Sequence, residues 1–366
     1  MEKAKISVIQ LFALMFIFEL GTALVVSYGT GAGKDAWLSI LLAMSGGIVL
    51  SFIHYFLFHR YSNLPLTGYV RKIFGKYIGW IISLCYCVYF LYICGRNVRE
   101  FGSIIVSSTL PETPLLVINI ALVLVMCYVL HLGVEVVGRT AEVFIVILFL
   151  LGAVGNFFVL VSGDVDFHQI RPFLEHGWKP IFTTAFPHLI VFPFGEMIAF
   201  TMLLPYLNRP ELTKRVWLTA VISSGLILSW TVLLNTSVLG IDVMQRSVFP
   251  TLTAVGKVNL FDFIERLDAI VVFTLLITVF FKASIYLYAA VIGIADLFKA
   301  NTYHRILLPI GTIVIFLSLT MASSFSEQGE EGFLIEKYIS FPLFIVIPLF
   351  MLVISIIRNY VKNKTS

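Results

Sequence analysis

Residues 186–205, with the sequence FPHLIVFPFGEMIAFTMLLP, constrain the fold of this chain more than any other stretch. The stretch can cross a bilayer, since about 20 apolar residues span the hydrocarbon core. Pro193, Gly195 and Glu196 interrupt its middle. Proline removes a helical hydrogen bond, glycine makes non-helical dihedral angles accessible, and a charge at mid-membrane is costly and usually functional.

Two interpretations of this interruption remain open. Backbone exposed to lipid cannot stay unpaired, so an opened turn must face a protein cavity or a ligand. The stretch therefore predicts a broken helix at a binding site. The alternative is a proline-kinked helix that buries a protonated Glu196.

The composition assigns the class of protein. The 366 residues are 59% hydrophobic and 13% charged, whereas soluble chains are about 45–50% apolar and 25% charged. These values predict a helical membrane protein in contact with the lipid bilayer. The net charge of +4 does not indicate nucleic acid, because the cations lie in short loops between apolar runs. The four cysteines lie inside apolar segments, so we expect neither disulfides nor a metal site, and no cofactor motif is present.

The apolar runs predict ten membrane segments in a single domain covering residues 1–366. Their boundaries are 8–29, 37–58, 77–107, 115–131, 141–161, 183–205, 214–236, 265–294, 305–323 and 338–357. Lysine and arginine are concentrated in the loops on the side that holds both termini. The positive-inside rule therefore predicts that the N- and C-termini are cytoplasmic.

The order of the segments suggests an inverted repeat. Segment 1 carries Glu19-Leu20-Gly21-Thr22 at mid-span, and segment 6, five segments later, carries Phe194-Gly195-Glu196. Because five is odd, the second half would enter the membrane from the opposite side. Two interrupted helices in corresponding positions indicate a transporter-like binding site. The repeats would cover approximately residues 8–161 and 183–357.

The two interruptions suggest an amino-acid ligand. A half-helix that begins after Gly21 would present backbone N–H groups and a dipole that favour an anion. A free amino acid carries a carboxylate for such a terminus and an ammonium for carbonyl groups or for Glu196. Close helix packing through small residues is the alternative explanation for Gly21 and Thr22.

Ionisable residues inside the segments predict an internal charge network. Segment 3 carries a polar stripe at helical spacing that includes Tyr92, Arg96 and Arg99, and segment 8 carries Lys282. Arginine inside a membrane helix must pair, snorkel or face water. Possible partners of Arg96 are Glu19, Glu100 and Glu196, whereas Arg99 could snorkel. The ammonium of Lys282 could take the place of a bound cation beside segment 1, or it could snorkel. The network is predicted to comprise Glu19, Arg96, Arg99, Glu196 and Lys282.

Four stretches carry a resemblance to a known family. The opening EKAKISVIQLF, the pair Gly21-Thr22, the run GKDAWLSILL at 33–42 and PFGEMIAFTMLLP at 193–205 resemble the B subunits of GerA-type spore germinant receptors. The resemblance implies an all-α membrane fold of the amino acid–polyamine–organocation superfamily (LeuT/APC-like). That fold has ten helices in a 5+5 inverted repeat, with helices 1 and 6 broken.

The resemblance also implies a function, a location and partners. The protein would lie in the inner membrane of the endospore and bind a small nutrient, commonly an amino acid. It would act with a larger A subunit and a lipoprotein C subunit. By position, the ligand site would comprise Gly21, Thr22, Tyr92, Arg96, Phe194, Gly195, Glu196, Ser284 and Tyr288.

Two functional classes remain. One is a nutrient sensor in which binding shifts a conformational equilibrium, and the other is a secondary amino-acid transporter coupled to protons or cations. Superfamily transporters often have apolar residues where this chain has Arg96 and Lys282, which argues against ordinary cation coupling. An enzyme is not expected, since the sequence contains no convergent catalytic set.

Overall fold

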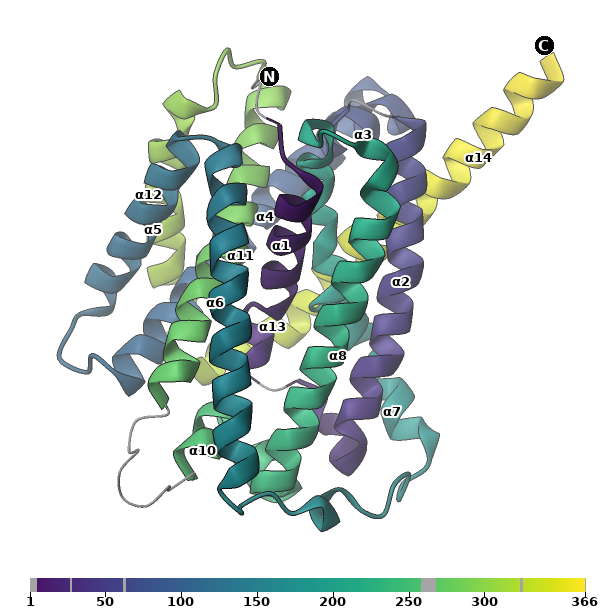
Figure 1. The fold of residues 1–366 in the computed structure, drawn as a ribbon. Coiled ribbons are helices and arrows are strands. Elements are labelled where there is room, and N and C mark those ends of the chain that lie inside the picture. Colours follow the sequence, from purple (N-terminus) through teal and green to yellow (C-terminus); the bar gives the residue numbers. More distant parts are fainter. Residues whose placement is uncertain (1–4, 27, 62–63, 258–267, 323–324, 366) are drawn as a thin grey trace.

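The computed structural model describes residues 5–26, 28–61, 64–257, 268–322 and 325–365, and these form an all-helical bundle (Figure 1). The α-helices are α1 (Val8–Leu20), α2 (Ala36–Arg60), α3 (Leu66–Phe74), α4 (Lys76–Ser108), α5 (Leu115–His131), α6 (Val134–Val161), α7 (Trp178–Thr184), α8 (Thr213–Leu239), α9 (Ile241–Arg246), α10 (Pro250–Lys257), α11 (Asp268–Leu297), α12 (His304–Thr320), α13 (Phe325–Ile335) and α14 (Ile347–Thr365).

The helices of the bundle agree with the predicted membrane segments. Seven helical stretches are long and apolar enough to cross a membrane, namely Thr30–Arg60, Lys76–Ser108, Val134–Val161, Trp178–Met202, Pro210–Leu239, Asp268–Leu297 and Glu327–Val361. Shorter apolar helices at α1, α5 and α12 fall on the other predicted segments. Both termini lie at the same end of the bundle, as an even number of crossings requires (Figure 1).

The first helix is shorter than predicted. The Ser7 hydroxyl accepts from the Gln10 backbone N–H, and the Gln10 side chain accepts from the Ser7 N–H, so this capping box starts α1 at Val8. Gly21, with a φ of 35°, ends it, because only glycine adopts such angles without a steric cost. One 3₁₀ turn, Thr22–Leu24, follows in place of the expected half-helix.

The predicted helix 6 consists of several short pieces. α7 continues into a π-helical stretch, Ala185–Leu189, and the chain turns at Phe192 and Pro193. It then forms a 3₁₀ helix over Phe194–Met202. The interruption thus precedes Gly195, which lies inside the 3₁₀ helix. The role of Gly195 is close packing, since an added Cβ would lie 3.1 Å from the Ile190 carbonyl oxygen.

The last helix begins earlier than predicted. Residues 325–335 form α13 where the acidic stretch predicted a loop. Two π-helical stretches, Glu336–Ser340 and Pro342–Val346, join α13 to α14. Tyrosine hydroxyls on α4 satisfy groups in these irregular turns: Tyr86 donates to the Leu343 carbonyl, and Tyr89 bonds to the Ser340 hydroxyl.

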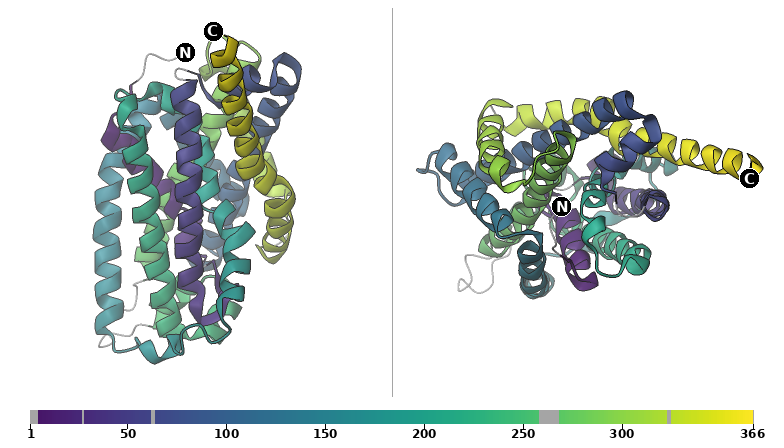
Figure 2. Two further views of the ribbon diagram at one scale, coloured as in Figure 1. Left: turned by 90° about the vertical axis from the view of Figure 1, so that its right-hand side faces the viewer. Right: turned by 90° about the horizontal axis from the view of Figure 1, so that it is seen from above.

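α1 lies inside the bundle, against α6, α8 and α11 (Figure 2). Just before α1, the Ile6 N–H donates to the Tyr206 carbonyl at 2.8 Å, and the Asn208 N–H donates to the Ile6 carbonyl at 3.0 Å. The start of helix 1 is therefore tied to the end of helix 6. This pairing brings the two interrupted segments together in the core.

Candidate functional site

Threonines from neighbouring helices satisfy the backbone groups that the first interruption opens. The Thr278 hydroxyl, on α11, donates to the Gly21 carbonyl at 3.0 Å. The Thr251 hydroxyl, on α10, donates to the Leu24 carbonyl at 2.7 Å. Unpaired carbonyl groups are costly away from water, so these bonds hold the chain open beyond α1.

Lys282 lies where the two interruptions meet. Its Nζ is 2.5 Å from Glu196 Oε2, and both side chains are buried, with exposed fractions of 0% and 6%. The ammonium also lies 4.2 Å from the centre of the Phe192 ring, within the range of cation–π attraction. An added Cβ on Gly21 would come within 2.5 Å of Lys282 Cδ. Lys282 therefore fills the space beside Gly21 and does not snorkel to the membrane surface.

Glu19 is the second carboxylate near this ammonium. It is completely buried, and its Oε2 accepts a hydrogen bond from the Ser224 hydroxyl on α8. Its Oε1 has no hydrogen-bond partner among the described residues. Of the two predicted acidic partners, Glu196 is thus the one that contacts Lys282, and Glu19 is anchored to α8.

Among the described residues, the direct contacts of the two arginines are with groups other than Glu19, Glu196 and Lys282. Arg96 Nε is 3.3 Å from Glu100 Oε1, one turn along α4. The Arg99 guanidinium donates to the carbonyl groups of Ser318 and Leu319 at the end of α12, 3.3 Å from each. Arg99 therefore satisfies the carbonyls of a helix end and contacts neither Glu19 nor Glu196.

A small cavity of about 30 Å³ lies between the two interruptions and the π-helical stretches that join α13 to α14. Its lining comprises Thr22, Tyr28, Tyr89, Tyr92, Ile93, Arg96, Asn97, Glu100, Val191, Phe192, Glu196, Glu336, Ser340 and Phe344. Of the predicted ligand residues, it brings together Thr22, Tyr92, Arg96 and Glu196. The volume is about that of one water molecule.

The other predicted ligand residues do not line this cavity. Gly21 packs against Lys282, and Phe194 packs against Gly47 of α2. Gly195 packs beside Phe344, and Ser284 is completely buried in α11. Tyr288 has its ring 6.4 Å from that of Tyr206 and 5.8 Å from that of Tyr303, the latter between α11 and α12. The resemblance assigned Ser284 and Tyr288 to the ligand site by position, whereas the depth at which each side chain lies depends on packing.

A larger cavity of about 480 Å³ adjoins the small one and shares with it Tyr28, Arg96, Glu100 and Glu336. It also includes Thr30, just before α2, and Thr184, the last residue of α7, in the half of the bundle away from the termini (Figure 1). This volume lies in the range of small-molecule sites, about 300–1,000 Å³. The two cavities form a path from that end of the bundle to Glu196.

α13 and the π-helical stretch Glu336–Ser340 contribute residues that are absent from the predicted site. Glu336 Oε2 lies 3.5 Å from His188 Nδ1, and the ring of Phe333 stacks on His188 with the centres 4.0 Å apart. The Gln328 amide donates to the Arg96 carbonyl at 3.2 Å. The predicted segment begins at residue 338, so the sequence places these side chains in a loop. One sequence feature indicates their part in the site: the carboxyl-bearing Glu336 stands directly before an apolar run containing Pro342.

The site has more acidic than basic groups. Glu196 is paired with Lys282, and Glu100 is paired with Arg96, whereas Glu336 faces His188. Glu336 thus supplies a carboxylate beyond those neutralised by the two buried cations. With five aromatic rings in the lining, such a site suits a small polar ligand with an amine.

Comparisons with solved structures identify the fold. The structure matches MHP1, a nucleobase-cation-symport-1 family transporter in a closed conformation with bromovinylhydantoin bound. The TM-score is 0.72 at 12% identity, covering 96% of this chain and 78% of MHP1. It also matches MhsT in complex with L-phenylalanine, with a TM-score of 0.69 at 15% identity, covering 95% of this chain and 87% of MhsT. The protein is therefore a multi-pass integral membrane protein with the LeuT fold.

Comparisons of sequence identify the family. The family model described as "Spore germination protein" matches residues 5–326. Spore germination protein KB of Bacillus subtilis (strain 168) is 36% identical over 366 residues, covering 100% of this chain and 98% of the relative. Spore germination protein XB of Bacillus anthracis is 25% identical over 300 residues, covering 80% of this chain and 81% of the relative. The chain belongs to the Spore_permease family of spore germination proteins, as a transporter-like, non-enzymatic B-type subunit.

Proposed function

We propose that this protein is the nutrient-sensing subunit of a spore germinant receptor. It lies in the inner membrane of the endospore, with both termini in the cytoplasm. It binds a small nutrient, an amino acid, at mid-membrane and signals to an A subunit and a lipoprotein C subunit. The observation that carries the proposal is the cavity between the two interruptions, with Arg96 and Glu100 on one wall and Glu196, held by Lys282, on another.

An inverted repeat of residues 8–161 and 183–357 accounts for the position of this cavity. Helices 1 and 6 would be equivalent members of the two halves, entering the membrane from opposite sides. Their interruptions at Gly21 and at Phe192–Pro193, and the pairing of Ile6 with Tyr206 and Asn208, support this arrangement. Inverted-repeat transporters bind substrate between such helices.

The charges of the site suit a zwitterionic ligand. The ligand carboxylate pairs with Arg96, a planar group that binds carboxylates bidentately. The ligand ammonium lies near Glu336, which, unlike Glu100 and Glu196 in the same cavity lining, faces a histidine and not a buried arginine or lysine. The nutrient approaches through the larger cavity, which shares Arg96 and Glu336 with the smaller one.

Binding generates a signal because the small cavity must enlarge. Its volume of about 30 Å³ does not hold an amino acid. A ligand that occupies only an enlarged state shifts the population toward that state by its differential affinity. Movement of α13, whose Gln328 contacts Arg96, provides the enlargement and transmits it to the partner subunits.

The alternative is a secondary amino-acid transporter coupled to protons or cations. The likeness to the two solved transporters favours it, but a shared fold does not fix function. The Lys282 ammonium favours the sensor. It lies beside Gly21 as a covalently attached cation, so it cannot dissociate and drive transport as a coupled ion does.

A germination screen with a matched arginine control tests the proposal. Spores with this receptor and its partners are exposed to single amino acids, and the half-maximal concentration is measured. Arg96→Gln removes a hydrogen bond to a charged group, worth about 1.5–3 kcal/mol, and is expected to raise that concentration at least about tenfold. Arg139→Gln breaks another i,i+4 pair, with Glu135, on the exposed side of α6 and is expected to have no effect.

Uptake into vesicles separates the two functions. We expect the purified chain to bind the active amino acid without accumulating it in vesicles. An unchanged half-maximal concentration in Arg96→Gln spores, together with uptake that this substitution abolishes, would refute the sensor and support the transporter.

A further inference from the structure

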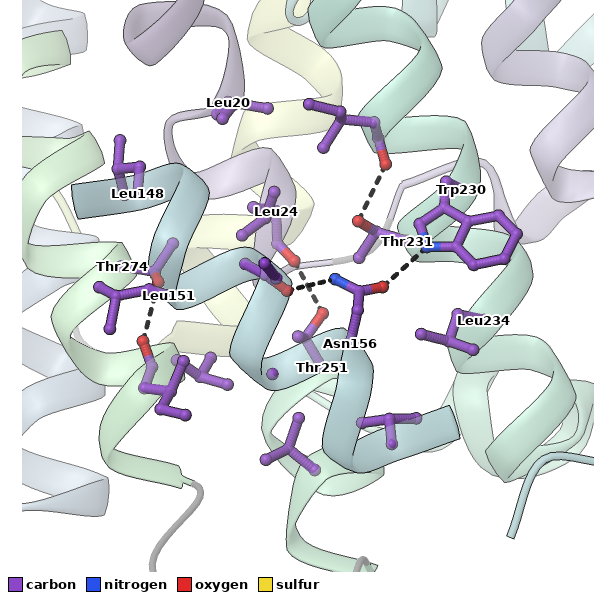
Figure 3. Close-up of a pocket in the computed structure, with 18 of the residues that line it drawn as sticks. Leu20, Leu24, Leu148, Leu151, Asn156, Trp230, Thr231, Leu234, Thr251 and Thr274 are labelled. Atoms are coloured by element: carbon purple, nitrogen blue, oxygen red, sulfur yellow. Dashed lines mark hydrogen bonds between the residues drawn. The ribbon is translucent and has the colours of Figure 1, made fainter. Parts of the chain in front are cut away.

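A third cavity, of about 400 Å³, lies apart from the nutrient site between α1, α6, α8, α10 and α11 (Figure 3). It shares no lining residue with the two cavities described above. Most of its lining is apolar, from helices α6 and α8 on one side and from Leu20 and Leu24 on the other. We call this space the lateral groove.

The outer walls of the lateral groove face the hydrocarbon of the membrane. α6 is the least buried of the seven long apolar stretches. Of its 18 most apolar consecutive residues, 11% are buried inside the protein. Leu150 and Phe157 on α6 are 62% and 60% exposed, and Leu226 on α8 is 52% exposed. In a multi-pass membrane protein such apolar surface is in contact with lipid, so the groove adjoins the lipid interface.

The described residues do not fill the groove. A Cβ added to Gly152 would meet no atom within 4 Å, and one added to Gly155 would meet only Ile270, at 3.6 Å. Protein interiors are normally close-packed, because an empty space forfeits dispersion contacts. An extended hydrocarbon chain can lie in a space of this size, and a helix of another subunit is the competing occupant that the last experiment below distinguishes.

One part of the wall is polar. Trp230 Nε1 donates to Asn156 Oδ1 at 2.7 Å, and the Asn156 amide nitrogen donates to the Gly152 carbonyl at 2.7 Å (Figure 3). The second N–H of that amide makes no hydrogen bond to a described residue, so the pair leaves one donor at the groove wall. Trp230 and Asn156 lie six and five residues inside the ends of the predicted segments 214–236 and 141–161, so this polar spot lies within the apolar span and not at the headgroups.

We propose that the lateral groove binds one acyl chain of a bilayer phospholipid. The chain lies along Gly152 and Gly155 and contacts Leu20 and Leu24, which flank the interruption at Gly21. It thereby supports the opened backbone of helix 1 from the lipid side. This site does not depend on the identity of the nutrient or on whether the protein senses or transports it.

Photolabelling of the full-length chain tests the proposal. The chain is placed in nanodiscs containing phosphatidylcholine with a diazirine on one acyl chain, irradiated, digested and analysed by mass spectrometry. We expect preferential labelling of peptides from α6 and from the beginning of α11. Even labelling around the lipid-facing surface would overturn the proposal.

A groove-filling variant makes the test quantitative. Gly152→Leu displaces about two methylene groups of the chain and is expected to lower groove labelling at least about tenfold. The variant is expected to fold, since leucine favours a helix over glycine. Val154→Leu adds apolar volume to the same helix outside the groove and is expected to leave labelling unchanged. Equal labelling of Gly152→Leu and wild type would contradict the proposal.

The assembled receptor tests the competing occupant. A photoreactive amino acid replaces Ala153, which lines the groove, in the full complex. The expected product is a lipid adduct of this chain. A cross-link from this position to a helix of another subunit, in place of the lipid adduct, would overturn the proposal.

Discussion

The two buried ion pairs of the site differ in what they connect. Lys282 and Glu196 belong to different parts of the chain, and their pair joins α11 to the segment after the second interruption. Arg96 and Glu100 lie one turn apart on α4, with exposed fractions of 15% and 9% against 0% and 6% for the first pair. The first pair holds two elements together, whereas the second is contained in one helix and borders both cavities.

This difference separates a structural charge from one available to a ligand. Loss of either member of the Lys282–Glu196 pair leaves a charge buried without compensation. Arg96 can exchange Glu100 for another carboxylate without disconnecting two helices. The architecture thus combines a fixed pair that maintains the site with an adaptable pair that meets the ligand. The following experiments test this contrast, beginning with the largest expected effect.

Breaking the long-range pair is expected to be most damaging. Glu196→Gln leaves Lys282 unpaired in the core, and breaking a buried pair costs about 3–5 kcal/mol. The purified variant is expected to unfold at a markedly lower temperature than wild type in the same detergent. Adding Lys282→Met is expected to restore part of the loss, and a double-mutant cycle measures the coupling. Additive losses would show that these residues do not stabilise each other.

Gly21→Ala is expected to have the next largest effect. Gly21 has a φ of 35°, and an added Cβ would lie 2.5 Å from Lys282 Cδ, so the substitution adds backbone strain and overpacking of about 1–3 kcal/mol. Gly163→Ala is the control, since Gly163 also has a positive φ, 84°, but no atom lies within 4 Å of its added Cβ. Thermal unfolding of both proteins isolates the packing contribution. Equal losses would mean that Lys282 does not restrict Gly21.

The local pair is expected to matter less for stability than the long-range pair. Arg96 and Glu100 border the larger cavity and lie on one helix, so Arg96→Gln exposes the Glu100 carboxylate to a cavity and disconnects no two elements, and it is expected to lower the unfolding temperature less than Glu196→Gln does. The same substitution should strongly raise the nutrient concentration needed for germination. If Arg96→Gln unfolds as readily as Glu196→Gln, the proposed contrast between the pairs is incorrect.

The smallest effect is expected at Tyr288. Tyr288→Phe removes a hydroxyl near Tyr206 and Tyr303, away from the two cavities of the site. Tyr92→Phe removes a hydroxyl from the wall of the small cavity. The half-maximal nutrient concentration is expected to rise for Tyr92→Phe and to remain unchanged for Tyr288→Phe. The reverse result would restore Tyr288 to the ligand site.

Sequence alone determined the features that depend on local composition. Apolar runs of membrane length located the crossing segments, because the hydrocarbon core sets their length and polarity. Gly21 and Pro193 located the interruptions to within a few residues, because their backbone preferences are intrinsic. Glu196 and Lys282 stood out because a charge at mid-membrane requires a partner wherever it lies.

Tertiary structure decided the features that depend on which distant side chains meet. Helical spacing left Glu19, Glu100 and Glu196 equally possible partners for Arg96, and only packing assigned Glu196 to Lys282. Glu336 enters the site because Tyr86 and Tyr89 bind the π-helical stretches between α13 and α14, and local propensity does not predict these contacts. The lateral groove exists because α6 leaves Gly152 uncovered. Hydropathy fixes which segments enter the membrane, but contacts between helices fix which faces meet, since every apolar face is equally soluble in lipid.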